Sequence, residues 1–285
     1  MIVVKTIEDL QKNLSKIKSG NQSKLGFVPT MGALHEGHLS LIRNSKEMCE
    51  TTAVSIFVNP LQFNDPSDFD NYPVTTERDL NLCEQEKADI VFIPERSEMY
   101  RTEAPTISFQ IGFGMDVLCA PGRPGHFEGV LHIVSRLFHL FYPDFAFFGK
   151  KDFQQLAFIQ RMVRELNFPL EIIGCDTVRE KNGLAMSSRN LRIPEPEKED
   201  ATLIYRALKL GKKIFEERES TPEEVREIVS DVIKSGSKNR VEYVEIVNPK
   251  TLEAVFDFQN IDKIVIATAV FVGNVRLIDN IECEK

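Results

Sequence analysis

The strongest constraint on the fold is the alternation of short apolar runs with helical segments through the first half of the chain. Apolar spacing near the helical period predicts helices over residues 39–49, 75–85, 130–141 and 152–166. The apolar runs around them predict strands over residues 24–28, 52–58, 89–93, 145–148 and 170–174. Strands that are separated by helices pair in parallel through right-handed crossovers, and ligands bind at their carboxyl ends. The first half is therefore predicted to be an α/β domain with a parallel sheet.

The pattern changes after about residue 186. Two charged amphipathic helices are predicted over residues 195–217 and 222–235, followed by strands over 241–247, 263–269 and 275–279. The acidic, proline-marked stretch over residues 194–200 is interpreted as the solvated start of the first of these helices. We therefore predict a larger, ligand-binding domain over residues 1–186 and a smaller α+β domain over residues 187–285 that acts as a lid.

Length, charge and cysteine usage narrow the class of protein. With 285 residues and 42% hydrophobic composition, the chain can bury a sizeable core. It has no apolar run near the roughly 18 residues of a membrane span and no signal-peptide pattern at its start. A net charge of −8 disfavours a protein that mainly grips nucleic acid, although a local basic site stays open. Five dispersed cysteines without a CxxC argue against a disulfide framework or a zinc site, and we expect a cytoplasmic enzyme with small-molecule substrates.

A glycine-containing motif follows the first predicted strand and opens a helix. It is the run PTMGALHEGHL over residues 29–39. Gly32 and Gly37 permit a sharp turn and close approach of a ligand, and a helix start offers N–H groups to phosphate. His35 and His38 face the same way on a helix and can donate hydrogen bonds to phosphoryl oxygens. The glycines favour a nucleotide site over two alternatives, which are an ordinary strand–helix turn and a metal-binding histidine pair.

A second polar cluster, FFGKKDFQQ over residues 147–155, lies at the end of another predicted strand. A lysine in this glycine turn can reach phosphates as a point charge. Asp152 is a candidate for the same site, with a helix N-cap as its alternative, and Gln155 lies one turn later.

Three further segments carry candidate polar groups. In GLAMSSRN over residues 183–190, two hydroxyls and a guanidinium suit a phosphate, although Ser-Ser-Arg is also common in loops. In NPLQF over residues 59–63, Gln62 offers both a donor and an acceptor to a small polar substrate. In GRPGHFEGV over residues 122–130, Arg123 and His126 flank a proline turn, with a loop anchored by buried hydrogen bonds as the alternative.

Taken together, these stretches resemble the pantothenate synthetase family, in order and over essentially the whole chain. The resembling stretches are PTMGALHEGH (29–38), FVNPLQF (57–63), GRPGHFEGV (122–130), FFGKKDFQQ (147–155) and TVREKNGLAMSSRN (177–190). The family belongs to the nucleotidyltransferases that share HIGH-type and KMSKS-type signatures with class I aminoacyl-tRNA synthetases. HEGH (35–38) is similar to the first signature and MSSR (186–189) to the second. The resemblance implies a Rossmann-like nucleotidyltransferase domain, a homodimer, and ATP- and magnesium-dependent condensation of pantoate with β-alanine, with release of AMP and pyrophosphate.

The resemblance also implies roles for residues. His38 would be the catalytic histidine, with His35, Lys151 and Arg189 neutralising phosphate charge. Pantoate would be bound by Gln62 and Gln155. β-Alanine would be bound by Gln62, Arg123 and His126, and magnesium would associate with Asp79. The residues expected to bind ATP are Met31, Gly32, Ala33, Leu34, His35, Glu36, Gly37, His38, Gly149, Lys150, Lys151, Asp152, Val178, Met186, Ser187, Ser188 and Arg189.

Two positions depart from the family pattern. The family usually has glutamate where this chain has Lys150, and arginine where it has Val74. The first departure adds positive charge near the expected phosphates, and the second removes any role of that arginine.

Three other functions compete with a pantoate ligase. A small cytidylyl- or adenylyltransferase would meet its phosphate acceptor with cations, whereas Gln62 and Gln155 are neutral. A tRNA-charging enzyme fits poorly with the acidic balance. A nucleotide-sensing module without turnover fits poorly with so many separate polar clusters.

Overall fold

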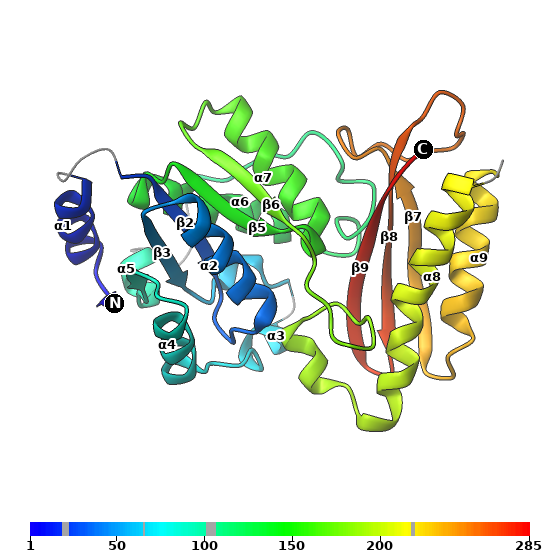
Figure 1. Cartoon of the computed structure of the whole chain (residues 1–285), viewed down its shortest axis with the longest axis horizontal. Helices are drawn as coiled ribbons and strands as arrows, with labels where there is room; N and C mark the ends of the chain where they lie inside the picture. Colours follow the sequence, from blue (N-terminus) through cyan, green and yellow to red (C-terminus); the bar gives the residue numbers. More distant parts are fainter. Residues whose placement is uncertain (19–22, 65, 101–106, 218–219) are drawn as a thin grey trace. The chain divides into compact units, whose positions relative to one another are not determined.

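The computed structural model describes residues 1–18, 23–64, 66–100, 107–217 and 220–285 (Figure 1). Contacts divide the chain into two compact units. Unit 1 comprises Met1–Gln110, Arg123–Lys150 and Phe158–Asp176, and unit 2 comprises Ile111–Gly122, Lys151–Ala157 and Thr177–Lys285. The predicted domain boundary after residue 186 stays a prediction, because units defined by contacts are not a test of independent folding.

Unit 1 is built on a six-stranded sheet with the order β1-β4-β3-β2-β5-β6. Every neighbouring pair is parallel, which confirms the predicted parallel sheet. The strands are β1 (Ile2–Val4), β2 (Leu25–Thr30), β3 (Thr51–Ile56), β4 (Ile90–Phe92), β5 (Phe145–Gly149) and β6 (Glu171–Cys175). Sequence reasoning missed β1, a three-residue edge strand that is too short to show a period.

The order of the strands reverses between β2 and β5. From β2 the chain steps outward to β3 and β4, and it then returns to the other side of β2 with β5 and β6. In open α/β sheets, ligands bind beyond the carboxyl ends of the strands at such a reversal. The fold of unit 1 therefore predicts a ligand site at the segments that follow Thr30 and Gly149.

Helices cover both faces of this sheet. In chain order, the helical elements up to β6 are α1 (Ile7–Lys18), α2 (Glu36–Met48), α3 (Pro66–Asp70), α4 (Thr76–Gln85), α5 (Arg96–Met99), α6 (His126–Phe141) and α7 (Phe153–Glu165), with 3-10 turns η1 (Pro60–Gln62) and η2 (Lys150–Asp152). On one face, α2 and α4 contribute to a core with alternate strand residues such as Val28 and Phe147. On the other face, Phe27 stacks on Phe141 of α6 with ring centroids 4.2 Å apart.

Helix α1 was not predicted, although its sequence carries a signal. The Thr6 hydroxyl accepts a hydrogen bond from Asp9 N at 3.1 Å, which caps the first turn. Leu10 and Leu14, one turn apart, are buried.

Unit 2 contains a three-stranded antiparallel sheet, β7-β8-β9, covered by two helices. The strands are β7 (Asn239–Val247), β8 (Lys263–Val272) and β9 (Val275–Glu284), and the helices are α8 (Lys198–Glu217) and α9 (Pro222–Lys234). Two 3-10 turns, η3 (Ser188–Arg192) and η4 (Glu195–Glu197), precede α8. These elements confirm the predicted smaller α+β region.

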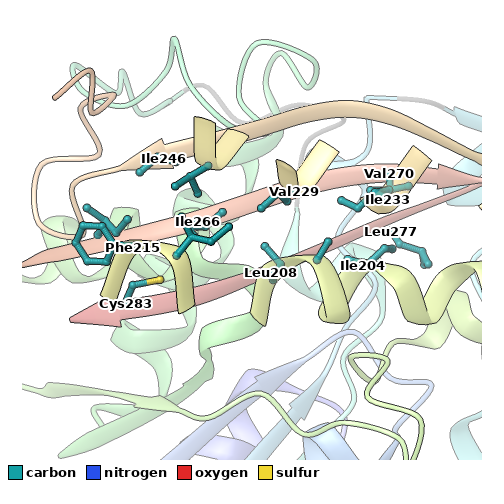
Figure 2. Close-up of a cluster of buried hydrophobic side chains, with 14 of the residues drawn as sticks. Ile204, Leu208, Phe215, Val229, Ile233, Ile246, Ile266, Val270, Leu277 and Cys283 are labelled. Carbon is teal, nitrogen blue, oxygen red and sulfur yellow. The ribbon is translucent and has the colours of Figure 1, made fainter. Parts of the chain in front are cut away.

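The core of unit 2 lies between the helices and the sheet. Figure 2 shows Ile204, Leu208 and Phe215 of α8 facing strand residues that include Ile266 and Leu277. Leu208 and Phe215 are fully buried. Among the residues that the structure describes in either unit, no helix has the length and apolarity needed to cross a bilayer.

Replacement of Leu208 by alanine is expected to lower the free energy of unfolding by about 2–5 kcal/mol, because removing most of this buried side chain leaves a cavity in the core. Leu210→Ala on the same helix is the matched control, since Leu210 is 38% exposed. Its expected change is about 0.5 kcal/mol or less. Chemical denaturation of the two variants checks the difference, and equal effects would contradict the assignment of this core.

Candidate functional site

The segment that follows β2 makes a tight turn that side-chain hydrogen bonds hold in place. Gly32 and Ala33 both have positive φ angles, of 80° and 48°. The Thr30 hydroxyl donates to Ser55 O at 2.8 Å and accepts from Gly32 N at 3.2 Å. A Cβ on residue 32 would lie 3.0 Å from Oδ2 of Asp79, so glycine is needed there for space as well as for its φ angle.

The carboxylate of Asp79 holds this turn from the side of α4. Asp79 is 1% exposed. Its two oxygens accept hydrogen bonds from Ala33 N at 2.9 Å and Leu34 N at 2.8 Å. The Thr75 hydroxyl donates to the same carboxylate at 3.1 Å. These hydrogen bonds hold the turn against the first part of α4.

His35 and His38 lie together at the start of α2. His35 is the N-cap residue, and its Nδ1 accepts from Gly37 N at 3.2 Å. Nδ1 of His38 accepts from His35 N at 3.4 Å. The ring centroids are 4.1 Å apart. Because Nδ1 is the acceptor in each ring, the neutral tautomer that these bonds favour carries its proton on Nε2, where each ring presents a donor.

Gln62 is buried in η1 after β3, and both ends of its amide are oriented. Nε2 donates to Sδ of Met31 at 2.9 Å, and Oε1 accepts from Asn59 Nδ2 at 3.1 Å. Asn59 is 1% exposed and also accepts from the Tyr100 hydroxyl at 2.8 Å. Burial raises the pKa of Tyr100 to about 12, so this hydroxyl stays a donor at neutral pH. The structure thus brings Gln62 and Met31 together from two different loops.

Arg123 and His126 form a chain of hydrogen bonds to the main chain of Gln62. Nη1 of Arg123 lies 2.9 Å from Nε2 of His126, and Nδ1 of His126 lies 2.6 Å from O of Gln62. A guanidinium can only donate, so Nε2 accepts and Nδ1 carries the proton that Gln62 O receives. His126 is 6% exposed, and this arrangement makes it a support for Gln62.

Helix α6 can approach η1 closely because residue 129 is glycine. A Cβ there would lie 2.2 Å from O of Leu61, which is main chain and cannot move aside. Asn59 Nδ2 donates to Gly129 O at 3.1 Å across the same contact.

Lys150 follows the carboxyl end of β5. Its ammonium, which is partly exposed, donates to Oδ1 of the exposed Asp176 at 2.8 Å. The positive charge by which Lys150 departs from the family pattern therefore has a carboxylate beside it. Val74, the other departure, is 75% exposed.

In unit 2, the segment from Val178 to Arg189 forms a short hairpin and a capped turn. Arg179 pairs with Ala185 in an antiparallel bridge, and Met186 N donates to Val178 O at 3.0 Å. The Ser187 hydroxyl then caps η3 by accepting from Arg189 N at 3.2 Å. The hairpin brings Val178 and Met186 into contact and places Ser187–Arg189 directly after them.

Lys151 and Gln155 also belong to unit 2. The Lys151 ammonium is 4.0 Å from Asp152 Oδ1, and its side chain is 18% exposed. Gln155 is half-buried on the first turn of α7. Its neighbour Gln154, which sequence reasoning left without a role, accepts from Cys119 N at 2.8 Å and donates to Gly114 O at 2.7 Å. Gln154 is thus a loop anchor.

The predicted site residues fall into two groups. Unit 1 holds Met31–His38, Gln62, Asp79, Arg123, His126, Gly149 and Lys150, and unit 2 holds Lys151, Asp152, Gln155, Val178 and Met186–Arg189. Sequence reasoning gave no role to Asn59 or Tyr100, which orient Gln62. The signal for Asn59 was its place directly after a buried strand.

The prediction that Asp79 binds magnesium stays a prediction. Its hydrogen bonds to two main-chain N–H groups and one hydroxyl favour a structural role. Within the described parts of the chain, no group of three or more His, Cys, Asp or Glu residues is arranged to hold a metal ion. A magnesium ion at a nucleotide usually needs only one or two protein carboxylates, because waters and substrate phosphates supply its other ligands, so the role of Asp79 is left open by this finding.

Comparison with known proteins identifies relatives along the whole chain. The family described as Pantoate-beta-alanine ligase matches residues 2–282. The pantothenate synthetase of Leptospira interrogans serovar Lai is 50% identical over 281 residues, covering 99% of this chain and 98% of that protein. The pantothenate synthetase of Caldicellulosiruptor bescii is 44% identical over 284 residues, covering 100% of this chain and 99% of that protein.

Solved structures agree. The pantothenate synthetase of Thermus thermophilus superposes with a TM-score of 0.92 at 36% identity, and each chain is covered completely, at 100%. The pantoate-beta-alanine ligase of Francisella tularensis, complexed with beta-gamma ATP and β-alanine, superposes with a TM-score of 0.79 at 31% identity, with 99% of this chain and 97% of that chain covered.

Asp79→Asn is expected to lower the free energy of unfolding by about 1–3 kcal/mol, because an amide leaves one main-chain N–H facing an NH₂ group. The turn that precedes His35 should loosen, and ATP binding measured by calorimetry should weaken. Asp89→Asn is the matched control, since Asp89 also accepts a main-chain N–H, from Thr52 at 2.7 Å, in the same unit. An Asp79→Asn protein with the ATP affinity of the Asp89→Asn protein would contradict this role.

Proposed function

The chain belongs to the pantoate-beta-alanine ligase family, and we infer that it condenses pantoate with β-alanine in an ATP-dependent reaction. The observation that carries this function is the pair of imidazoles at the start of α2. They follow β2, at the point where the strand order reverses and nucleotide sites of such folds gather. The mechanism and the residue roles below are parts of the same proposal.

The first step makes the carboxylate of pantoate reactive. A carboxylate oxygen attacks the α-phosphorus of ATP, the bond from that phosphorus to the bridging oxygen breaks, and pyrophosphate leaves. The product is pantoyl-adenylate, a mixed anhydride. Because the attacking group is already an anion, this step needs alignment and charge stabilisation and no general base.

His35 and His38 stabilise the charge that builds on the phosphoryl oxygens. Both rings present Nε2–H groups, since both Nδ1 atoms accept main-chain hydrogen bonds. The N-terminal end of α2 adds N–H groups and a positive dipole. Donors fixed in this way before the reaction need no reorganisation during it, which is how such groups lower a barrier.

ATP is further bound by residues of unit 2 and by the end of β5. These are Gly149–Asp152, Val178 and Met186–Arg189. Lys151 and Arg189 supply positive charge to the phosphates. The support is their chemistry, the capped turn that presents Ser187–Arg189, and the resemblance to the family.

Pantoate is bound by Gln62 and Gln155. β-Alanine is bound by Gln62, Arg123 and His126. The amide of Gln62 is oriented by Met31 and Asn59, and its main chain is held by His126. Arg123 acts on the β-alanine side, through its own charge and through His126. In the second step the neutral amine of β-alanine attacks the acyl carbon, AMP leaves, and the amine loses a proton.

Three further properties complete the proposal. The enzyme is cytoplasmic, which fits its dispersed cysteines. It forms a homodimer, as the family resemblance implies. Magnesium would accompany ATP and supply positive charge there, with Asp79 as the carboxylate associated with it.

A coupled assay tests the function directly. AMP release and sustained pyrophosphate release should occur only when ATP, pantoate and β-alanine are all present. Pantoate and ATP alone should give one equivalent of pyrophosphate per active site. Pyrophosphate release that does not depend on pantoate would indicate a nucleotidyltransferase with another acceptor. No pyrophosphate release would indicate a nucleotide-binding module.

His38→Ala should lower the rate of pantoate-dependent pyrophosphate release by about 10²–10³, the scale for loss of one preoriented donor. The matched control is His139→Ala, because His139 is an exposed histidine near the end of α6 whose ring bonds Ser135 O. A His38→Ala enzyme as active as the His139→Ala enzyme would remove His38 from the mechanism.

A further inference from the structure

Two adjacent buried polar residues of β9 have no part in the function described so far. Asp279 is 4% exposed and Asn280 is 7% exposed. Buried polar side chains carry a desolvation cost unless they are hydrogen-bonded, so their partners show what they stabilise. Each is bonded to a different segment of unit 2 that carries expected phosphate-binding residues.

Asp279 holds the hairpin that leads to Ser187–Arg189. Its carboxylate accepts from Nη1 of Arg179 at 2.6 Å and from Nη2 at 3.0 Å, a two-point ion pair. The Arg179 guanidinium lies over the Tyr205 ring at 3.6 Å and donates to Gly183 O at 3.2 Å. Arg179 is thereby fixed on three sides, and the turn of the hairpin is fixed with it.

Asn280 holds the main chain of the lysine in the other segment. Its Nδ2 donates to Lys151 O at 2.9 Å. Successive side chains of a strand point to opposite faces, so Asp279 shares a face with Leu277 and Cys283 of the core, and Asn280 has the opposite face. One strand can therefore anchor two segments at once.

The positive charges of Arg179 and Lys151, one from each held segment, both act on the Asp279 carboxylate. Burial raises the pKa of Asp279, whereas the neighbouring cations Arg179 and Lys151 oppose that rise. Lys151 is thus near enough to Asp279 to act on its charge, in addition to the main-chain bond through Asn280.

We propose that Asp279 and Asn280 are positioning residues for adenylate formation, which set Lys151 and the Ser187–Arg189 turn in fixed register along β9. This inference rests on the proposed function, in which Lys151 and Arg189 act on the phosphates of ATP. The pair acts indirectly, through the segments that it holds. It acts by keeping two cationic segments at the spacing that the triphosphate requires, and a misplacement of about 1 Å at such groups lowers a rate by about 10²-fold.

The test compares the two half-reactions in Asn280→Ala. After pyrophosphate has left, the cations have less charge to stabilise, so the two steps should respond differently. Pantoyl-adenylate formation should slow by about 10–100-fold, with a raised KM for ATP. Conversion of supplied pantoyl-adenylate and β-alanine in a single turnover should change by about threefold or less. A mainly structural defect would instead slow both steps alike.

Asn239→Ala is the matched control. Asn239 is a partly buried asparagine of β7 whose Nδ2 also donates to main-chain carbonyls, of Asp200 at 2.8 Å and Ile233 at 2.9 Å. Its loss should lower the melting temperature and leave the ratio of the two half-reactions unchanged.

Arg179→Lys provides a second route, because it keeps the charge and loses the two-point bond to Asp279. It should show the same selective loss of adenylate formation even if Asn280→Ala folds poorly. Equal slowing of both steps, or a wild-type ratio in both variants, would refute the positioning role. If the wild-type protein releases no pyrophosphate with pantoate, the proposed function itself is wrong, which is a separate outcome.

Discussion

The parallel pairing of β2 with β3 on one side and β5 on the other is the constraint on which the candidate site of unit 1 depends. Parallel pairing places the carboxyl ends of all three strands at one edge of the sheet. The segments that follow those ends are the histidine turn, the Gln62 turn and the Gly149–Lys150 turn. The backbone hydrogen bonds of the sheet thereby bring loops with candidate functional side chains, far apart in sequence, to the same edge.

Buried polar side chains then give these loops their shapes. Asp79 holds the turn before His35, Asn59 orients the Gln62 amide, and His126 holds the Gln62 main chain. Each is nearly fully buried, so breaking any of these bonds would leave an unpaired group in a poorly solvated place. In unit 2, Asp279 and Gln154 do the corresponding work.

The sequence anticipated the fold well wherever an element was long and periodic. The helix predicted over residues 130–141 is all but the first turn of α6 (His126–Phe141), and the strand predicted over 263–269 is the first part of β8 (Lys263–Val272). Short or terminal elements escaped, because β1 has three residues and pairs only at the edge of the sheet. The starts of α2 and α6 were placed late, at residues 39 and 130, since first-turn residues such as Glu36 and His126 lie outside the apolar period.

By itself, the sequence determined the α/β class, the second smaller α+β region, the family, and the residue types that meet phosphate and polar substrate. Those follow from local periodicity and from motifs, which need no knowledge of distant contacts. Only the tertiary structure decided which residues support others. Asp79 lies 46 positions from Ala33, and Asn280 lies 129 positions from Lys151. Such partnerships depend on how helices pack on a sheet and on which face of a strand each side chain occupies, and no spacing along the chain encodes them.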